Sequence, residues 1–286
     1  GGICLNWGCI PTKALLKSAN VFEYISHAKD YGIEVKDFKP DLPGMVKRSR
    51  EVAASNSKGV QFLFKKNKIE LIEGTGKIKK GGKVEVTDKS GKKVDYEAKH
   101  TIIATGGRSR ELPSMKIDGK KIIGYREAMV LDTIPKKLLV VGSGAIGVEF
   151  AYFYKAIGSE VTIVEFLPRI VPVEDEEVSK TLEKSFKKMG MTIHTNSEVT
   201  KVDTSGKGCV ATVKTPTGEI KIEVDIVLSA VGIATNLEGI GLEEVGVKTD
   251  KGRVVVDDYY KTNVEGVYAI GDIVKGPALA HVASAE

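Results

Sequence analysis

The spacing of apolar and polar residues changes along the first third of the chain. Residues 11–26 and 42–66 repeat their apolar positions at helical spacing, and Pro11 lies in a first turn, where its missing N–H is tolerated. After these two predicted helices the spacing shortens. Short strands separated by glycine-rich turns are predicted at residues 69–72, 83–86, 94–96 and 101–104.

A linker with Pro113 and Gly119 leads into a second region, which begins near Asp132. This region alternates between the two kinds of element, and such alternation indicates a parallel sheet and an α/β fold class. Strands are predicted at residues 138–141, 160–165, 191–194 and 226–231, helices at 145–157 and 175–189, and a hairpin at 209–214 with 220–223. From about Gly239 the chain leaves this region, and one further buried strand is predicted at 267–270.

Composition constrains the class of protein and the number of domains. The chain has 286 residues, of which 42% are hydrophobic and 28% charged, as in ordinary globular proteins, and this length suggests two domains or one interrupted by another. No apolar run is long enough for a membrane span, and residues 1–30 lack the features of a signal peptide, so the cytoplasm or an organelle matrix or stroma is predicted. The chain opens at Gly1 without Met and closes at Glu286 inside a predicted helix, so we expect a piece of a longer protein.

The net charge of +5 does not indicate a nucleic-acid partner. Lysine and glutamate alternate along the chain, and the densest basic stretch, residues 77–93, is interpreted as an exposed hairpin. A nucleic-acid interface would combine clustered cations with a reading motif, and the sequence has no such motif.

Cys4 and Cys9 form the first chemically informative motif. The four residues between them include Gly8 and can fold back to the distance that a disulfide needs. Cys9 precedes the helix that Pro11 begins, and the helix dipole together with the Lys13 cation favours a thiolate there. These features favour a redox pair, while a structural disulfide, two unpaired thiols and a metal site stay open as alternatives; no further ligands at zinc spacing are near.

A second motif follows a predicted apolar strand. Gly142, Gly144 and Gly147 form the pattern GxGxxG at the start of a predicted helix, which is the context of a dinucleotide-binding turn. A pyrophosphate would lie on the helix N-terminus. Glu165, at the end of the next strand, is suited to accept hydrogen bonds from both adenine ribose hydroxyls and to repel a 2′-phosphate, which favours NAD over NADP.

The segment from Gly1 to Lys13, with both cysteines, resembles the active-site signature of the pyridine nucleotide–disulfide oxidoreductases. Its Cys-Leu-Asn start and its Lys-Ala-Leu-Leu ending are most similar to the dihydrolipoamide dehydrogenase branch of that family. Ile3, Trp7 and Thr12 are mild departures, because the family more often has Thr or Val, Val and Ser at these positions. The resemblance implies that Cys4 is the interchange thiol, that Cys9 passes electrons to a flavin, and that Lys13 lies near the flavin.

The resemblance extends to both cofactors that the family uses, FAD and NAD. It implies a flavin-binding Rossmann-like unit with an inserted NAD-binding Rossmann-like unit, built from parallel sheets and β-meanders, with residues 1–112 and 241–286 in the flavin unit and residues 113–240 in the NAD unit. Around the nicotinamide nucleotide it assigns Gly142, Gly144, Ile146, Gly147, Glu149, Glu165, Val231, Gly232 and, on the adenine side, Val199. Around the flavin it assigns Lys13, Gly76, Thr105, Gly106, Asp272 and Ala280.

Function follows from the resemblance as an expectation. It implies oxidation of dihydrolipoamide to lipoamide with NAD⁺ as acceptor, a homodimer, and a lipoyl domain of a 2-oxo acid dehydrogenase or glycine cleavage complex as partner. No metal site is predicted. An NADPH-dependent disulfide or mercuric reductase and a catalytically inactive nucleotide-binding fragment are the alternatives. The family's other flavin GxGxxG and its His–Glu dyad are expected outside these residues, so the chain alone is expected to be inactive.

Overall fold

The computed structural model describes residues 2–286, and Gly1, the first residue of the cysteine motif, lies outside them. The chain divides into two compact units. The first unit combines the residues up to Ser57 with Ser109–Gly232, and the second combines Lys58–Arg108 with Ile233–Glu286. Each unit is therefore built from segments that are far apart in the sequence.

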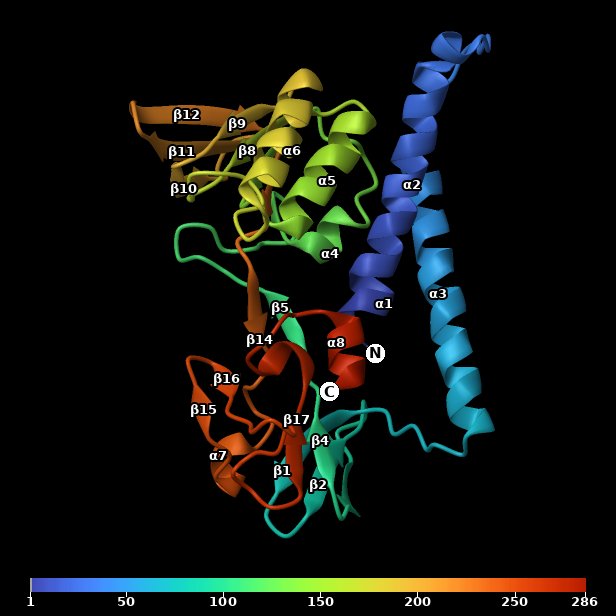
Figure 1. Ribbon diagram of the computed structural model, residues 1–286, viewed down its shortest axis with the longest axis vertical. Helices are drawn as coiled ribbons and strands as arrows, with labels where there is room; N and C mark the ends of the chain where they lie inside the picture. The colour runs from blue at the N-terminus through green and yellow to red at the C-terminus, as the bar shows by residue number, and fades with distance from the viewer. Residues whose placement is uncertain (1) are drawn as a thin grey trace. The chain divides into compact units, whose positions relative to one another are not determined.

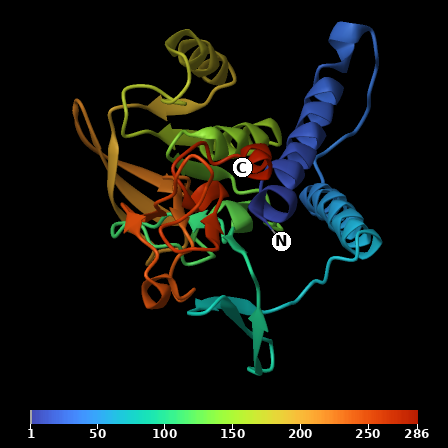
Figure 2. The ribbon, with the colours of Figure 1, turned by 60° about the horizontal axis from the view of Figure 1, so that its bottom comes forward.

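The first unit begins with three helices. A short α1 (Ile3–Trp7) is followed, after Gly8, by α2 (Cys9–Ser26), and α3 (Leu42–Lys66), which belongs to this unit as far as Ser57, runs beside α2 in the opposite direction (Figure 1, Figure 2). A single 3₁₀ turn, Ala28–Tyr31, follows α2 and ends at Gly32 in the left-handed region. Leu15, Ala19 and Leu42 are buried on the facing sides of these helices.

A five-stranded sheet forms the centre of the first unit. Its strand order is β6-β13-β7-β8-β9, and each neighbouring pair of strands is parallel, as the alternation of strands and helices predicts. The bounds are β6 (Ile122–Ile123), β7 (Lys137–Val141), β8 (Glu160–Val164), β9 (Thr192–His194) and β13 (Ile226–Ser229).

The sheet lies between a helical layer and a second sheet (Figure 1). Along β7, Leu138 and Val140 pack into the cluster that contains the helices, whereas Leu139 and Val141 pack into the cluster on the other face. Side chains alternate between the faces of a strand, so a fully apolar strand has both faces covered. The helical layer contains α4 (Tyr125–Ala128), α5 (Ala145–Ala156), α6 (Glu176–Lys188) and α2; the other face carries the antiparallel β10 (Glu198–Asp203), β11 (Cys209–Thr215) and β12 (Gly218–Val224).

The second unit contains small sheets around one apolar cluster, which includes Ile78, Ile103 and Ala269. An antiparallel meander, β1 (Thr75–Lys79), β2 (Lys83–Thr87) and β3 (Lys93–Glu97), precedes β4 (Thr101–Ile103). Strand β4 pairs in parallel with β17 (Val267–Ala269). The remaining elements are β5 (Gly107–Ser109) paired with β14 (Ile233–Thr235), β15 (Thr249–Asp250) paired with β16 (Arg253–Val254), α7 (Leu242–Val245), the 3₁₀ turn Gly271–Ile273 and α8 (Ala280–Ala285).

Most predicted elements are confirmed within a few residues, including the α/β class, the basic hairpin at 77–93 and the hairpin of β11 and β12. The predicted strand at 69–72 is wrong, because those residues form no strand and Ile69 and Leu71 are both 53% exposed. Apolar alternation makes a strand only where a neighbouring strand supplies hydrogen bonds, and none pairs with this segment within the described residues. No helix among the described residues is long and apolar enough to cross a membrane.

Candidate active site

The two cysteines of the N-terminal motif lie on either side of a sharp break between helices. Cys4 is half-buried on α1, and Cys9 is the exposed first residue of α2. Gly8, between them, has room for hydrogen alone: an added Cβ would lie 3.0 Å from the Ile3 carbonyl oxygen and 3.1 Å from the Cys4 Cα. The chain therefore folds back on itself at Gly8, and this fold brings the two free thiols within hydrogen-bonding reach of each other, while their redox pairing stays a prediction.

The Cys4 thiol is held in its protonated form. Burial, and after it a hydrogen bond with the Cys9 thiol, raise its pKa from 9.0 to about 11. Lys13 acts in the opposite direction, because its positive charge favours the thiolate. Cys209, by contrast, is 2% exposed on β11 and packs in the core between the two sheets, as a small apolar residue does.

The helix of Cys9 contacts the helix that follows the glycine-rich turn. Lys13 on α2 forms an ion pair with Glu149 on α5. The family resemblance assigns Lys13 to the flavin and Glu149 to the nicotinamide. The structure brings these two side chains, 136 residues apart, into direct contact, so the helix of the cysteine segment lies against the helix that follows the turn at Gly142.

The three glycines of the turn have three different surroundings. Gly142 has a positive φ of 93°, and a Cβ there would lie 2.5 Å from the Ala230 carbonyl oxygen. A Cβ on Gly147 would overlap the Gly142 carbonyl oxygen. At Gly144, the residue before α5, nothing lies within 4 Å. The open side of the turn is thus at the N-terminus of a 12-residue helix, where free amides attract a phosphate.

Glu165 follows β8 and is 7% exposed. Its Oε2 accepts hydrogen bonds from the Ser143 main-chain N at 2.7 Å and from the Ser143 Oγ at 2.6 Å, and its Oε1 accepts one from the Leu167 N at 2.8 Å. The carboxylate is therefore fixed beside the residue between Gly142 and Gly144. This position next to the helix N-terminus is suited to a ribose, although a role for Glu165 in binding it stays a prediction.

Other residues assigned to the nicotinamide nucleotide are placed as follows. Val231 and Gly232 follow β13 and run past the turn, since the Ala230 N donates to the Val141 carbonyl. Gly232 has a φ of 110° and open space at its Cβ position. Val199 is 4% exposed on β10 and packs in the core between the two sheets, and its predicted adenine contact stays a prediction.

In the second unit, the predicted flavin residues Thr105 and Gly106 follow strand β4. The Thr105 Oγ1 donates to the Asn236 carbonyl at 2.7 Å, the Asn236 side chain donates to the Thr105 carbonyl at 3.1 Å, and the Asn236 N donates to the Gly106 carbonyl at 2.9 Å. Asn236 was not among the predicted site residues. Its only signal in the sequence is an amide-bearing residue shortly after a strand, which is too common to single out.

Arg108 fixes the same segment from its other side. Its guanidinium contacts Glu238 through both carboxylate oxygens, at 3.0 and 2.7 Å, and also donates to the Thr235 carbonyl and the Asn236 side chain. The guanidinium is the main reason that the pKa of Glu238 falls to about 2. The Thr105–Gly106 crossover is therefore held by two residues that sequence reasoning missed.

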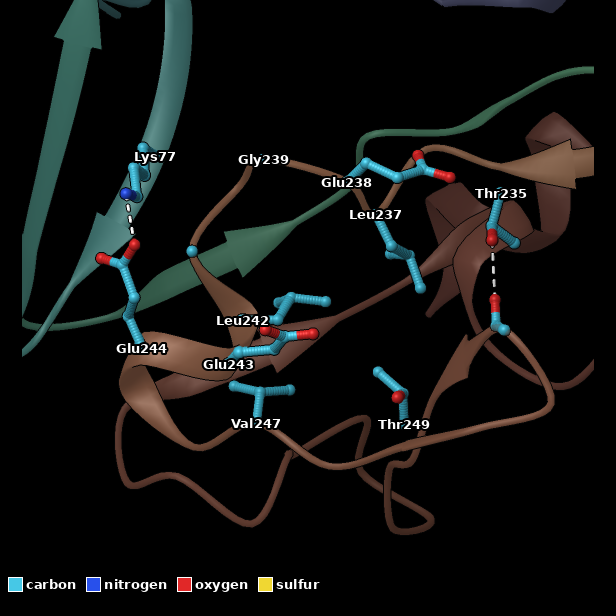
Figure 3. A pocket seen from close by; sticks show the side chains of 12 residues that line it. Lys77, Thr235, Leu237, Glu238, Gly239, Leu242, Glu243, Glu244, Val247 and Thr249 are labelled. Atoms are coloured by element: carbon cyan, nitrogen blue, oxygen red, sulfur yellow. Dashed lines mark hydrogen bonds and ion pairs between the residues drawn. The ribbon is translucent and has the colours of Figure 1, made fainter.

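A cavity of 510 Å³ lies beside this segment (Figure 3). Thr235 and Leu237 line it on either side of Asn236, and Glu244 pairs with Lys77 at its edge. None of the predicted site residues lines the cavity. Its walls instead support the loop that carries Asn236.

The remaining flavin candidates also lie in the second unit. Asp272 is half-buried in the 3₁₀ turn after β17, and within residues 2–286 no side chain or main-chain donor bonds its carboxylate. Gly76 lies on β1, and Ala280 begins α8. A half-buried carboxylate with free acceptor positions fits the hydroxyl groups of a ribityl chain. The open turn at Gly144 likewise fits a pyrophosphate, so the residues present fit both cofactors.

The chain is similar to known proteins along its whole length. The family described as "Pyridine nucleotide-disulphide oxidoreductase" matches residues 1–286. A dihydrolipoyl dehydrogenase of Rhizobium etli is 49% identical over all of this chain and 63% of its own length. A mitochondrial dihydrolipoyl dehydrogenase of Pisum sativum is 42% identical over 99% of this chain and 57% of its own length. A leghemoglobin reductase of Vigna unguiculata is 42% identical over 99% of this chain and 55% of its own length.

A solved structure gives the same result. LpdA from Mycobacterium tuberculosis superposes with a TM-score of 0.92 at 30% identity, covering all of this chain and 62% of that one. The chain thus spans about three fifths of the length of the relatives it matches. It is a homologue of dihydrolipoyl dehydrogenases with the mixed α/β architecture of flavin- and NAD-binding Rossmann-like units. Because the family pattern runs from its first residue to its last, the chain belongs to the pyridine nucleotide-disulphide oxidoreductases.

Proposed function

We propose that the protein oxidises dihydrolipoamide to lipoamide with NAD⁺ as acceptor, through a disulfide between Cys4 and Cys9. The observation that carries the proposal is the ion pair between Lys13 and Glu149. It joins the helix of the cysteine pair to the helix that begins at the glycine-rich turn. Electron transfer from thiols to a nicotinamide through a flavin requires both sites to lie close to the same flavin, and this contact supports that proximity. Similarity to dihydrolipoyl dehydrogenases supports the choice of substrate.

The chemistry divides between the two sulfur atoms. One thiolate of the substrate attacks the Cys4 sulfur, the Cys4–Cys9 bond breaks, and Cys9 leaves as a thiolate. The second substrate thiolate then attacks the sulfur bound to Cys4, which closes the lipoamide disulfide and releases Cys4. The substrate has lost two electrons and two protons, and the cysteine pair has gained the two electrons. When bound, FAD would carry those electrons from Cys9 to NAD⁺.

The residues of the chain determine which way each sulfur reacts. Cys9 begins an 18-residue helix, and the positive N-terminal end of that helix stabilises a thiolate leaving group. Cys4 keeps its proton at neutral pH, because burial and the Cys9 thiol raise its pKa to about 11. In the reverse direction, attack by Cys4 on lipoamide therefore needs a base that removes this proton.

The cofactor residues complete the proposal. In the first unit, Gly142, Gly144, Ile146 and Gly147 would hold the NAD pyrophosphate, and the fixed carboxylate of Glu165 would bind the adenine ribose. In the second unit, Gly76, Thr105, Gly106, Asp272 and Ala280 would hold FAD. We further propose a homodimer, a lipoyl domain of a 2-oxo acid dehydrogenase or glycine cleavage complex as partner, and the cytoplasm or an organelle matrix as location.

The test is NADH formation by the purified full-length protein that contains this chain, supplied with FAD, dihydrolipoamide and NAD⁺. Cys4→Ser and Cys9→Ser should each lower the rate at least about a thousandfold, because each removes one end of the disulfide. Cys209→Ser, which changes a core thiol remote from this chemistry, is the matched control and should keep the wild-type rate. A wild-type preparation that reduces glutathione disulfide with NADPH, and does not respond to dihydrolipoamide, would overturn the proposed substrate.

The preference for NAD over NADP has its own test. Glu165→Ala should weaken NAD⁺ binding about tenfold or more while narrowing the difference between NAD⁺ and NADP⁺, because a carboxylate no longer repels the 2′-phosphate. Isothermal titration with each nucleotide measures this difference. Stronger binding of NADP⁺ than NAD⁺ by the unchanged protein would contradict the assignment of Glu165.

A further inference from the structure

Three consecutive residues of α3 donate hydrogen bonds to the main chain of the cysteine segment. Arg48 donates to the Ala14 carbonyl at 2.8 Å, Ser49 to the Pro11 carbonyl at 2.9 Å, and Arg50 to the Asn6 carbonyl at 2.6 Å. As the residue number of the donor on α3 increases from 48 to 50, that of the acceptor decreases from 14 to 6, as expected for two segments that run antiparallel. Only the last of these bonds reaches the residues between the two cysteines.

The Asn6 carbonyl lies in the last turn of α1, which ends at Trp7 just before the main chain turns at Gly8. Arg50 supplies a charged donor to this helix end from outside the segment. A hydrogen bond with a charged donor is stronger than one between neutral groups.

Arg50 also contacts the side chain next to Asn6. Its guanidinium carbon lies 4.1 Å from the centre of the Trp7 ring, and that of Arg126, on α4, lies 5.7 Å from it. Both distances fall within the range of a cation–π interaction. The Arg50 guanidinium further contacts the Met129 sulfur at 3.7 Å, so it joins α1, α3 and the end of α4. Half-burial lowers the pKa of Arg50, yet it remains a cation at every physiological pH.

The Trp7 ring offers its aromatic face to two arginines, whereas an aliphatic side chain such as valine would offer none. We propose that Arg50 is a positioning residue for the Cys4–Cys9 pair, which it holds in closing distance by bonding Asn6 and stacking on Trp7. The inference rests on the proposed redox role of the pair and adds the residue that tunes it.

The physical effect is on the balance between disulfide and dithiol. Cys4 and Cys9 belong to different helices, so their separation depends on the angle between α1 and α2 at Gly8. Fixing the residues between them narrows the range of separations and raises the effective concentration of each thiol near the other. A held loop therefore favours the disulfide. Loosening it should shift the equilibrium toward the dithiol without touching either sulfur.

The experiment is a thiol–disulfide titration of the full chain against mixtures of reduced and oxidised dithiothreitol. One dithiothreitol dithiol reduces the Cys4–Cys9 disulfide to two thiols and becomes the cyclic disulfide, so two electrons and two protons move together. Alkylation followed by peptide mass spectrometry reports the state of Cys4 and Cys9 separately from Cys209. The titration needs no flavin and no turnover.

Arg50→Lys keeps the charge but loses the planar group that stacks on Trp7 and reaches Asn6. We expect its equilibrium constant to move about tenfold toward the dithiol, equivalent to about 30 mV for a two-electron couple. Arg48→Lys is the matched control, since Arg48 makes the same kind of bond from the same helix to Ala14, beyond the cysteine pair. It should leave the constant within about twofold of the wild type.

Trp7 provides a second, independent comparison if Arg50→Lys lowers the thermal midpoint of unfolding too far. Trp7→Val removes the ring and leaves the Asn6 carbonyl in place, and it should shift the constant about threefold in the same direction. Trp7→Phe keeps an aromatic face and should restore the wild-type constant.

The outcomes separate the two proposals. The positioning role would be overturned if the equilibrium constant shifted equally in the Arg50→Lys and Arg48→Lys variants. It would also be overturned if the constant did not shift in either Arg50→Lys or Trp7→Val. Both results would leave the redox pair intact. A wild-type chain that forms no Cys4–Cys9 disulfide at any dithiothreitol ratio would instead overturn the proposed function.

Discussion

Gly142, Gly144 and Gly147 differ in which atoms an added side chain would contact. This difference distinguishes the glycines that the fold requires from the one that matters only for ligand binding. Gly142 and Gly147 face the main chain of their own unit, where atoms do not move aside easily. Gly144 faces open space at the start of α5 and has a φ of −66°, which any residue adopts. The same motif therefore contains glycines that the fold requires and one whose lack of a side chain matters only to a ligand.

Gly147→Ala tests the first kind of glycine. Its methyl group would overlap the Gly142 carbonyl oxygen, so the helix and the turn have to separate. We expect the free energy of unfolding to fall by about 2 kcal/mol or more, as for other overpacked positions. Urea denaturation measures the loss. An unchanged free energy of unfolding would show that α5 is not packed against the turn in this way.

Gly144→Ala is the matched comparison for the second kind. Nothing lies within 4 Å of its added methyl group, so we expect the free energy of unfolding to stay within about 0.5 kcal/mol of the wild type. NAD⁺ affinity should nevertheless fall about tenfold or more, because the methyl group occupies the side on which a pyrophosphate would approach the amides. Calorimetric titration with NAD⁺ checks this, and unchanged affinity would remove the pyrophosphate from this turn.

The reduced Cys4 thiol should show its environment in its reactivity with pH. The thiolate is the reactive form, and the Cys4 pKa is raised from 9.0 to about 11. We expect the rate of Cys4 alkylation to stay low at pH 8 and to rise through pH 11. Cys9→Ser should move the profile to lower pH, since the Cys9 thiol is one cause of the shift. A wild-type midpoint near 9.0 would contradict this account.

The same shift has a consequence for stability, with a definite sign. A thiol whose pKa is raised by folding binds its proton more tightly in the folded chain than in the unfolded one. The stability that this proton contributes is fully present below pH 9 and is lost as the pH rises from 9 to 11. Urea denaturation of the reduced protein should therefore show a falling free energy of unfolding across that window, and a smaller fall in Cys4→Ser.

Helices α2 and α5 meet through polar contacts at both ends of an apolar interface. Lys13 pairs with Glu149, and the Tyr152 hydroxyl donates to the Glu23 carboxylate. Burial together with this carboxylate raises the pKa of Tyr152 to about 12. Leu15 and Ala19 fill the space between these pairs. The polar contacts fix the angle of two helices whose apolar packing alone permits sliding.

Tyr152→Phe tests the contribution of one of these contacts. The ring stays in place and the hydrogen bond to Glu23 is lost, so we expect the free energy of unfolding to fall by about 1 kcal/mol. Tyr31→Phe is the control, since Tyr31 is 66% exposed and its change should be within about 0.5 kcal/mol of zero. Equal effects of the two substitutions would mean that Tyr152 adds nothing through its hydroxyl.

The residues predicted to bind the two cofactors lie, apart from Lys13, in different units. Every residue assigned to the nicotinamide nucleotide lies in Ser109–Gly232, and all of those assigned to the flavin except Lys13 lie in the second unit. Lys13 belongs to the first unit and pairs with Glu149 there. The two nucleotides are therefore expected to stabilise different parts of the chain.

Hydrogen exchange with mass spectrometry tests this division. NAD⁺ should slow exchange at residues 142–149 and 165–167 and leave residues 101–107 and 267–286 unchanged, because a ligand protects the amides that it orders. FAD should do the reverse. Protection by NAD⁺ across the 101–107 crossover alone would contradict the assignment of the cofactors to the two units.

The sequence was sufficient wherever a few adjacent residues carry the physical reason. The helices at 11–26 and 42–66, the parallel strands around 138–141 and the glycine-rich turn all depend on local spacing and on the special backbone of glycine, which can be read along the chain. The cysteine pair belongs with them, because six residues contain both thiols and the flexible Gly8. The strand predicted at 69–72 fails because its hydrogen-bonding partner would have to come from elsewhere.

Contacts between distant segments depended on the folded chain. The bond from Arg50 to Asn6 spans 44 residues, the one from Asn236 to Thr105 spans 131, and the pair of Lys13 with Glu149 spans 136. The residues next to each of these side chains do not indicate its partner. An arginine or asparagine on a helix or loop has the same kind of neighbouring residues whether or not its side chain forms a hydrogen bond. Packing of the helices and strands brings the partners together, and it thereby decides which polar side chains hold the cysteine segment and the crossover in place.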